Sequence, residues 1–128
     1  MNIILLADNR KYDLLVNLCI AYTHIFEKHQ LLSLFNIAHL IKEHSGLNIQ
    51  SINADVAAGG QQLASLANYN EVDAVIYLRD PQAINYASGN DLLRACDINI
   101  IPYATNLASA EVLVMGIERG DLDWRTLI

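Results

Sequence analysis

Three aspartates stand at points where a chain of this kind could carry out acid–base or ligand-binding chemistry. Asp8 and Asp80 each follow a short apolar run that is typical of a buried strand, and Asp55 lies in the polar loop 53–60. A carboxylate within hydrogen-bond reach of a substrate can remove or return a proton, and it can accept hydrogen bonds from a polar ligand. Ordinary turn or capping roles are the alternative for Asp55 and Asp80.

Cationic, amide and glycine residues occupy comparable loop positions and are candidates for holding a small molecule. Lys11, Arg10 and Arg79 could each bind one anion, although a solvated surface position is the more ordinary role for the two arginines. The other candidate ligand-binding residues are Asn9, Asn36, Gly59, Gly60, Gln61, Thr105 and Asn106. Thr105 and Asn106 could instead cap the helix that follows them.

The elements that must position these residues alternate between strand and helix. Continuous or alternating apolar residues predict strands at 3–7, 31–35, 47–52, 74–78 and 98–103. Apolar stripes at helical spacing predict five helices, over about 11–29, 37–45, 63–67, 92–96 and 108–118. The second of these is expected to end in a left-handed cap at Gly46. Such alternation predicts a three-layer α/β/α fold around a five-stranded parallel sheet.

The parallel sheet explains why the candidate residues are expected to meet. Ligands of such sheets bind beyond the carboxyl ends of the strands, and the loops 8–11, 53–62, 79–89 and 104–106 all follow predicted strands. The chain has 128 residues without a linker, repeat or low-complexity stretch, so residues 1–128 are expected to form a single domain.

Composition excludes several classes of partner. The net charge is −6 and no basic run is present, so neither nucleic acid nor an anionic membrane is an expected partner. The apolar stretch near the start is five residues long, too short for a signal peptide or membrane span, so we expect a cytoplasmic protein.

The cysteines and histidines do not predict a metal site. Cys19 and Cys96 lie in different predicted helices, outside any CxxC spacing, and are expected to be reduced and partly buried. None of the four histidines has the spacing to a second histidine and a carboxylate that a zinc site requires. We therefore expect no metal ion.

Three segments, in matching order, resemble the methylglyoxal synthase family. Ala7-Asp8-Asn9 stands where the family has an Ala-His-Asp type sequence, and Gly59-Gly60-Gln61-Gln62 stands where it has Gly-Gly-Asp-Gln-Gln. The Asp80-Pro81 turn and the segment 98–106 match the family's Asp-Pro turn and its Asn-Ile-Pro and Ala-Thr-Asn elements. The resemblance extends from about residue 2 to about residue 118.

This resemblance implies strand order 3-2-1-4-5 and a reaction. Family members convert dihydroxyacetone phosphate to methylglyoxal and phosphate without a metal or organic cofactor. An aspartate base removes a proton beside the carbonyl, polarising groups stabilise the enediolate, and phosphate leaves. Asp80 matches the family's second active-site aspartate.

The sequence departs from the family at the positions that carry this chemistry. Gly60 precedes Gln61 directly, so the family's catalytic aspartate is either replaced by Gly60 or deleted, and Asp55 is the nearby carboxylate that could act in its place. The family's Thr-Gly-Thr-Thr-Gly phosphate loop corresponds to residues 34–38, which have neither glycine nor hydroxyl. The family's lysine in the first helix falls at Tyr12, beside Lys11.

Three hypotheses follow. The first is a methylglyoxal synthase-like protein that binds a small polar or phosphorylated metabolite without the standard catalytic aspartate. The second is a divergent methylglyoxal synthase with Asp8, Asp55 or Asp80 as base. The third is a receiver-like signalling module built on Asp8 and Asp55, for which the strand order would be 2-1-3-4-5.

The last predicted helix indicates self-association. It is apolar on more than one face, through Leu107, Ala110, Val112–Met115 and Ile117. One face can pack on the sheet. The other faces must be covered by another subunit or remain exposed to solvent, so a homo-oligomer is expected.

Overall fold

The central feature of the fold is a five-stranded parallel sheet in the order β3-β2-β1-β4-β5. The computed structural model describes residues 1–52, 56–84 and 86–128. Its strands are β1 (Asn2–Ala7), β2 (Gln30–Leu34), β3 (Gln50–Ile52), β4 (Ala74–Leu78) and β5 (Tyr103–Ala104). This confirms the predicted fold class and order, and the order differs from that of a receiver-like module.

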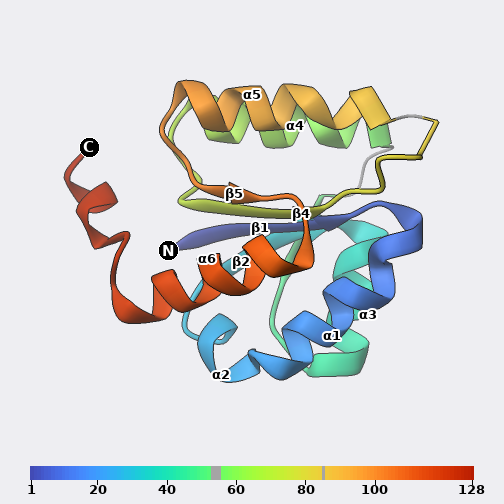
Figure 1. Ribbon diagram of the computed structural model, residues 1–128, viewed down its shortest axis with the longest axis horizontal. Helices are drawn as coiled ribbons and strands as arrows, with labels where there is room; N and C mark the ends of the chain where they lie inside the picture. Colours follow the sequence, from blue (N-terminus) through green and yellow to red (C-terminus); the bar gives the residue numbers. More distant parts are fainter. Residues whose placement is uncertain (53–55, 85) are drawn as a thin grey trace.

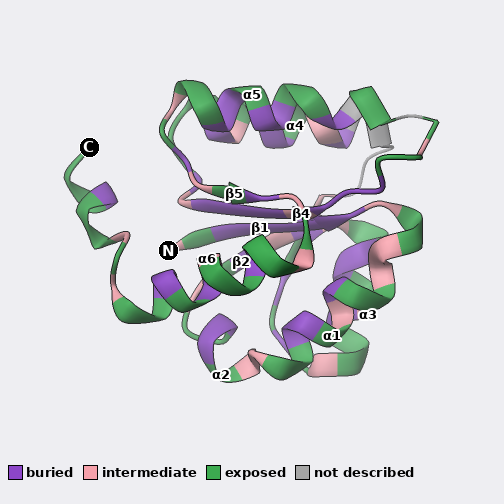
Figure 2. Ribbon diagram, viewed as in Figure 1, coloured by how far each residue is buried: buried purple, intermediate pink, exposed green. Residues whose placement is uncertain are grey.

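Helices cover both faces of the sheet, as a parallel sheet requires. Figure 1 shows α4 (Val56–Asn68) and α5 (Asn90–Ile98) on one face, with α1 (Tyr12–Ala21), α2 (Thr23–Phe26), α3 (Phe35–Ser45) and α6 (Leu107–Arg119) on the other. Short 3₁₀ turns span Asn9–Lys11, Tyr86–Gly89 and Asp123–Leu127. Figure 2 shows burial concentrated in the central strands and the sheet-facing sides of the helices.

The central strands are apolar over most of their length because both of their faces are covered. Residues 3–7 of β1 are all buried, and Leu5 is completely inaccessible. β4 runs beside β1 in register, from Ile3 opposite Ala74 to Ala7 opposite Leu78. This pairing brings the residues that follow the two strands, Asp8 and Arg79-Asp80, to the same edge of the sheet.

Two predicted helices have different bounds in the structure. The helix predicted over 11–29 is interrupted at Tyr22, because the Thr23 hydroxyl donates to the carbonyl oxygens of Cys19 (2.8 Å) and Ile20 (2.9 Å) at the end of α1. The loop predicted over 53–60 is also wrong in part, because α4 begins at Val56 and Gly59 and Gly60 are helical.

The strand predicted over 98–103 is wrong for most of its length. Ile98 ends α5, Ile100 adopts a left-handed conformation with φ 57°, and pairing with β4 is limited to Tyr103 and Ala104. A β-branched residue with positive φ cannot continue a strand. The left-handed cap predicted at Gly46 is confirmed by its φ of 75°.

The outer face of α6 leaves apolar side chains in contact with solvent. Val112 is 70% exposed and Met115 is 38% exposed, whereas Ala110, Val114 and Ile117 pack against the core. The homo-oligomer suggested by this helix stays a prediction. Within the described residues, none of the helices has the length and apolar character needed to cross a membrane.

Both cysteines are fully buried and unpaired, and burial raises the pKa of each thiol to about 12. The thiolate is the reactive form, and at pH 8 only about one in 10⁴ of each group would carry it. We expect a thiol-reactive disulfide reagent at pH 8 to modify neither residue in the native protein. Two equivalents should react after denaturation, and rapid native reaction at either cysteine would contradict this.

Candidate functional site

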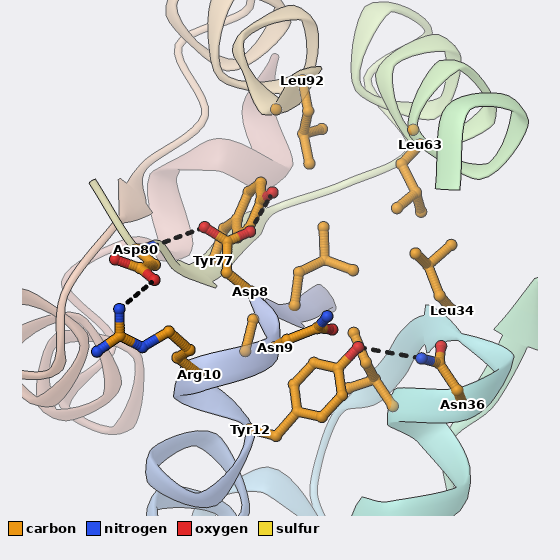
Figure 3. Close-up of a pocket in the computed structure, with 15 residues that line it drawn as sticks. Asp8, Asn9, Arg10, Tyr12, Leu34, Asn36, Leu63, Tyr77, Asp80 and Leu92 are labelled. Atoms are coloured by element: carbon orange, nitrogen blue, oxygen red, sulfur yellow. Dashed lines mark hydrogen bonds and ion pairs between the residues drawn. The ribbon is translucent and has the colours of Figure 1, made fainter. Parts of the chain in front are cut away.

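A cavity of about 190 Å³ opens at the carboxyl ends of β1, β2 and β4. Five of the predicted ligand-binding or catalytic residues line it, namely Asp8, Asn9, Asn36, Gly60 and Asp80. Figure 3 shows their arrangement, with the two aspartates at one end and Asn36 at the other. The structure therefore brings these residues together from four separate segments of the chain, as expected for the rim of a parallel sheet.

Asp8 is held in place by hydrogen bonds to both of its carboxylate oxygens. The Tyr77 hydroxyl donates to Oδ1 at 3.0 Å, and the backbone N–H of Asp80 donates to Oδ2 at 2.6 Å. Burial and the adjacent Asp8 carboxylate raise the pKa of Tyr77 to about 12. Tyr77 therefore keeps its proton and acts as a donor to Asp8 at every physiological pH.

Asp80 presents a second carboxylate at the same end of the cavity. Its side chain is 9% exposed, and its Oδ1 accepts a hydrogen bond from the Gln82 N–H at 3.0 Å. Its Oδ2 lies 3.7 Å from Nη1 of Arg10, which is an ion-pair distance but too long for a hydrogen bond. The Arg10 side chain is 75% exposed, so it lies at the mouth of the cavity.

The opposite end of the cavity is formed by the beginning of α3. This helix starts at Phe35 directly after β2, and its N-cap residue, Leu34, makes no side-chain capping bond. Leu34, Asn36 and Ile37 line the cavity. Asn36 Nδ2 donates to the Tyr12 hydroxyl oxygen at 3.0 Å. The first-turn N–H groups of a helix lack intrahelical acceptors and mark the positive end of its dipole, so this end favours negative charge.

Arg79 does not line the cavity and is not the solvated arginine that the sequence allowed. It is 6% exposed and donates to the Tyr86 carbonyl oxygen and, at 2.9 Å, to Asn90 Oδ1. Its guanidinium carbon lies 3.6 Å from the centre of the Tyr86 ring and 5.3 Å from that of Tyr77. Arg79 thus fixes the end of the 80–89 loop against β4 and α5.

The remaining predicted site residues lie elsewhere. Lys11, Gly59, Gln61, Thr105 and Asn106 are not among the residues that line this cavity. The Asn106 side chain caps α6 by accepting from the Ser109 N–H at 2.9 Å, and the Thr105 carbonyl oxygen accepts from the Arg79 N–H at 3.0 Å. Asp55 lies outside the described residues.

The two tyrosines of the cavity, Tyr12 and Tyr77, were not among the predicted ligand-binding residues. Tyr12 begins α1 after a 3₁₀ turn over Asn9–Lys11, and this turn places Tyr12, not Lys11, at the cavity. The match of Tyr12 to the family's lysine position was the available signal. Tyr77 carries a polar group within a continuous apolar strand, which is the signal for a residue that approaches the rim.

Among the described residues, no group of three or more histidine, cysteine, aspartate or glutamate side chains is placed to hold a metal ion.

Comparison with known proteins finds relatives that align with this chain over nearly the whole length of both proteins. A methylglyoxal synthase of Thermoanaerobacter sp. (strain X514) is 43% identical over 129 aligned residues, covering 99% of this chain and 98% of the relative. A methylglyoxal synthase of Caldicellulosiruptor saccharolyticus is 42% identical, covering 100% of this chain and 92% of the relative. No protein-family model matches the chain.

A solved structure shows the same fold. The crystal structure of methylglyoxal synthase from Elizabethkingia anophelis NUHP1 superimposes with a TM-score of 0.79 at 27% sequence identity. The superposition covers 88% of this chain and 76% of that chain.

Proposed function

We propose that this chain, which belongs to the methylglyoxal synthase family, binds a small polar molecule in the cavity beside Asp8 and Asp80. It does so without enediolate chemistry. The observation that carries this proposal is the charge of the cavity. Its described lining has two carboxylates and one cation, Arg10, which is exposed and already paired with Asp80. A phosphate dianion in this end of the cavity would meet net negative charge.

The local sequence supports the same proposal. The residue before Gln61 is a glycine, so no carboxylate stands directly before the Gln61-Gln62 pair, where the family has its aspartate base. The segment that would surround a phosphate, Leu34 to Ala38, offers no hydroxyl group.

A second candidate function is methylglyoxal synthesis itself, and the names of the relatives favour it over the first. Two features of the cavity support it. Asp80 is the better placed base of the two described carboxylates, because both oxygens of Asp8 already accept hydrogen bonds. The first turn of α3 could hold a phosphate through backbone N–H groups alone.

Incubation with dihydroxyacetone phosphate and a colorimetric assay for methylglyoxal separates the two functions. The first predicts no product above the uncatalysed background, while a methylglyoxal synthase relative assayed in parallel gives turnover. The second predicts turnover that Asp80→Asn lowers by about 10²–10⁴-fold, the usual contribution of a general base. Asp55→Asn tests the other candidate base in the same assay. Turnover by the unmodified chain would overturn the first proposal.

A further inference from the structure

The cavity has two ends of opposite electrostatic character, and this arrangement indicates a class of ligand. Figure 3 shows Asp8 and Asp80 on one side, Leu34 and Asn36 on the other, and Tyr12 and Asn9 between them. This ligand class rests on the proposed ligand-binding function and specifies what the cavity binds.

The acidic end is built to receive a positively charged donor. Asp80 is 7% exposed, and among the described residues its Oδ2 has only the long ion pair with Arg10. A carboxylate kept from water needs donors, and an ammonium group has three of them. Asp8 places a second negative charge beside it, and its orientation is fixed by Tyr77 and by the Asp80 N–H.

The other end is built to receive an anion. Leu34 cannot cap α3, and the first turn of this helix contains no acidic residue. Backbone N–H groups at such a position bind carboxylates and phosphates. The Tyr12 hydroxyl oxygen accepts from Asn36, which leaves the hydroxyl proton of Tyr12 to be donated to a ligand.

The space between the two ends is small and partly apolar. Leu6, Leu63 and Leu92 line it, and its volume of about 190 Å³ is below the roughly 300–1,000 Å³ of pockets that hold drug-sized ligands. We propose that this cavity binds a small zwitterion, an amino acid with little or no side chain. Its ammonium group lies at Asp8 and Asp80, and its carboxylate lies at the first turn of α3 and the Tyr12 hydroxyl.

Calorimetric titration of the intact protein tests this proposal with probes that carry one charged group or both. The zwitterions are L-alanine, β-alanine and γ-aminobutyrate, which differ in the separation of the two charges. Ethylamine carries the ammonium alone, propionate carries the carboxylate alone, and inorganic phosphate represents the family's leaving group. We expect at least one zwitterion to bind ten-fold or more tightly than ethylamine, propionate and phosphate.

Two substitutions assign the ends of the ligand. Asp80→Asn keeps the size of the side chain and should weaken zwitterion binding at least ten-fold, whereas Asp121→Asn, an exposed carboxylate after α6, should leave it unchanged. Tyr12→Phe should weaken binding of the zwitterion without changing any weak binding of ethylamine. Melting temperatures of the variants show whether each is folded.

The proposal is overturned if no zwitterion binds more tightly than about 10 mM, or if phosphate or propionate alone binds as well. Phosphate binding without turnover would leave the proposed binding function standing and refute only the zwitterion. Turnover of dihydroxyacetone phosphate would refute the proposed function itself.

Discussion

Replacing Arg125 by methionine is expected to lower the free energy of unfolding by about 2–4 kcal/mol, because a buried guanidinium that joins three parts of the chain would be lost. Arg125 is 2% exposed. It donates to the carbonyl oxygen of Ile100, to Asn70 Oδ1 at 2.8 Å and to the Val72 carbonyl oxygen at 3.3 Å. Methionine fills similar space but leaves these acceptors without a donor.

The position of these acceptors explains why the effect should be large. Asn70 and Ile100 are the two non-glycine residues with positive φ in the described chain, at 54° and 57°. Each lies just after a helix of the α4–α5 layer, and Arg125 holds both from the 3₁₀ turn near the C-terminus. Its loss would therefore release two strained turns together with the C-terminal segment.

Urea denaturation followed by circular dichroism measures this effect. The control is Arg119→Met, because Arg119 is 60% exposed and its ion pair with Asp121 lies at the surface. The control should change the free energy of unfolding by no more than about 0.5 kcal/mol. Equal losses for the two variants would show that Arg125 has no special structural role.

The same contacts show which part of the fold the sequence can predict. β1 and β4 are central strands covered on both faces, so each appears as a continuous apolar run, and β4 has the predicted bounds of 74–78. The predicted fifth strand failed because the left-handed turn at Ile100 is held by Arg125, 25 residues away. A contact at that separation leaves no local pattern in the sequence.

The candidate site likewise has one part that the sequence could predict and another that it could not. Asp8 and Asp80 were predicted to lie at the same rim because both follow parallel strands, and the strand order that the family resemblance implies makes those strands neighbours. The backbone N–H of Asp80 does bond Asp8. The orientation of Arg79 could not be predicted, since it depends on Tyr86 and Asn90 in and after a long loop. Topology therefore locates the rim, whereas the charge available in the cavity depends on side-chain pairings.

Replacing Gly89 by alanine is expected to lower the free energy of unfolding by about 1–3 kcal/mol and to disrupt the acidic end of the cavity. A Cβ atom at this position would lie 2.6 Å from Cε2 and 2.9 Å from the hydroxyl oxygen of Tyr77. The ring cannot move freely, because its hydroxyl donates to Asp8 and Arg79 lies over its face. Overpacking of this kind strains the surrounding structure.

Gly60→Ala is the matched control, because Gly60 also borders the cavity but a Cβ there meets nothing within 4 Å. Gly60 lies inside α4, where alanine is favoured over glycine, so this variant should gain up to about 1 kcal/mol. Urea denaturation gives both values, and the near-ultraviolet circular dichroism of the tyrosines reports any displacement of Tyr77. A Gly89→Ala protein as stable as the unmodified chain, with an unchanged tyrosine spectrum, would show that the Tyr77–Asp8 contact does not depend on the close approach of Gly89.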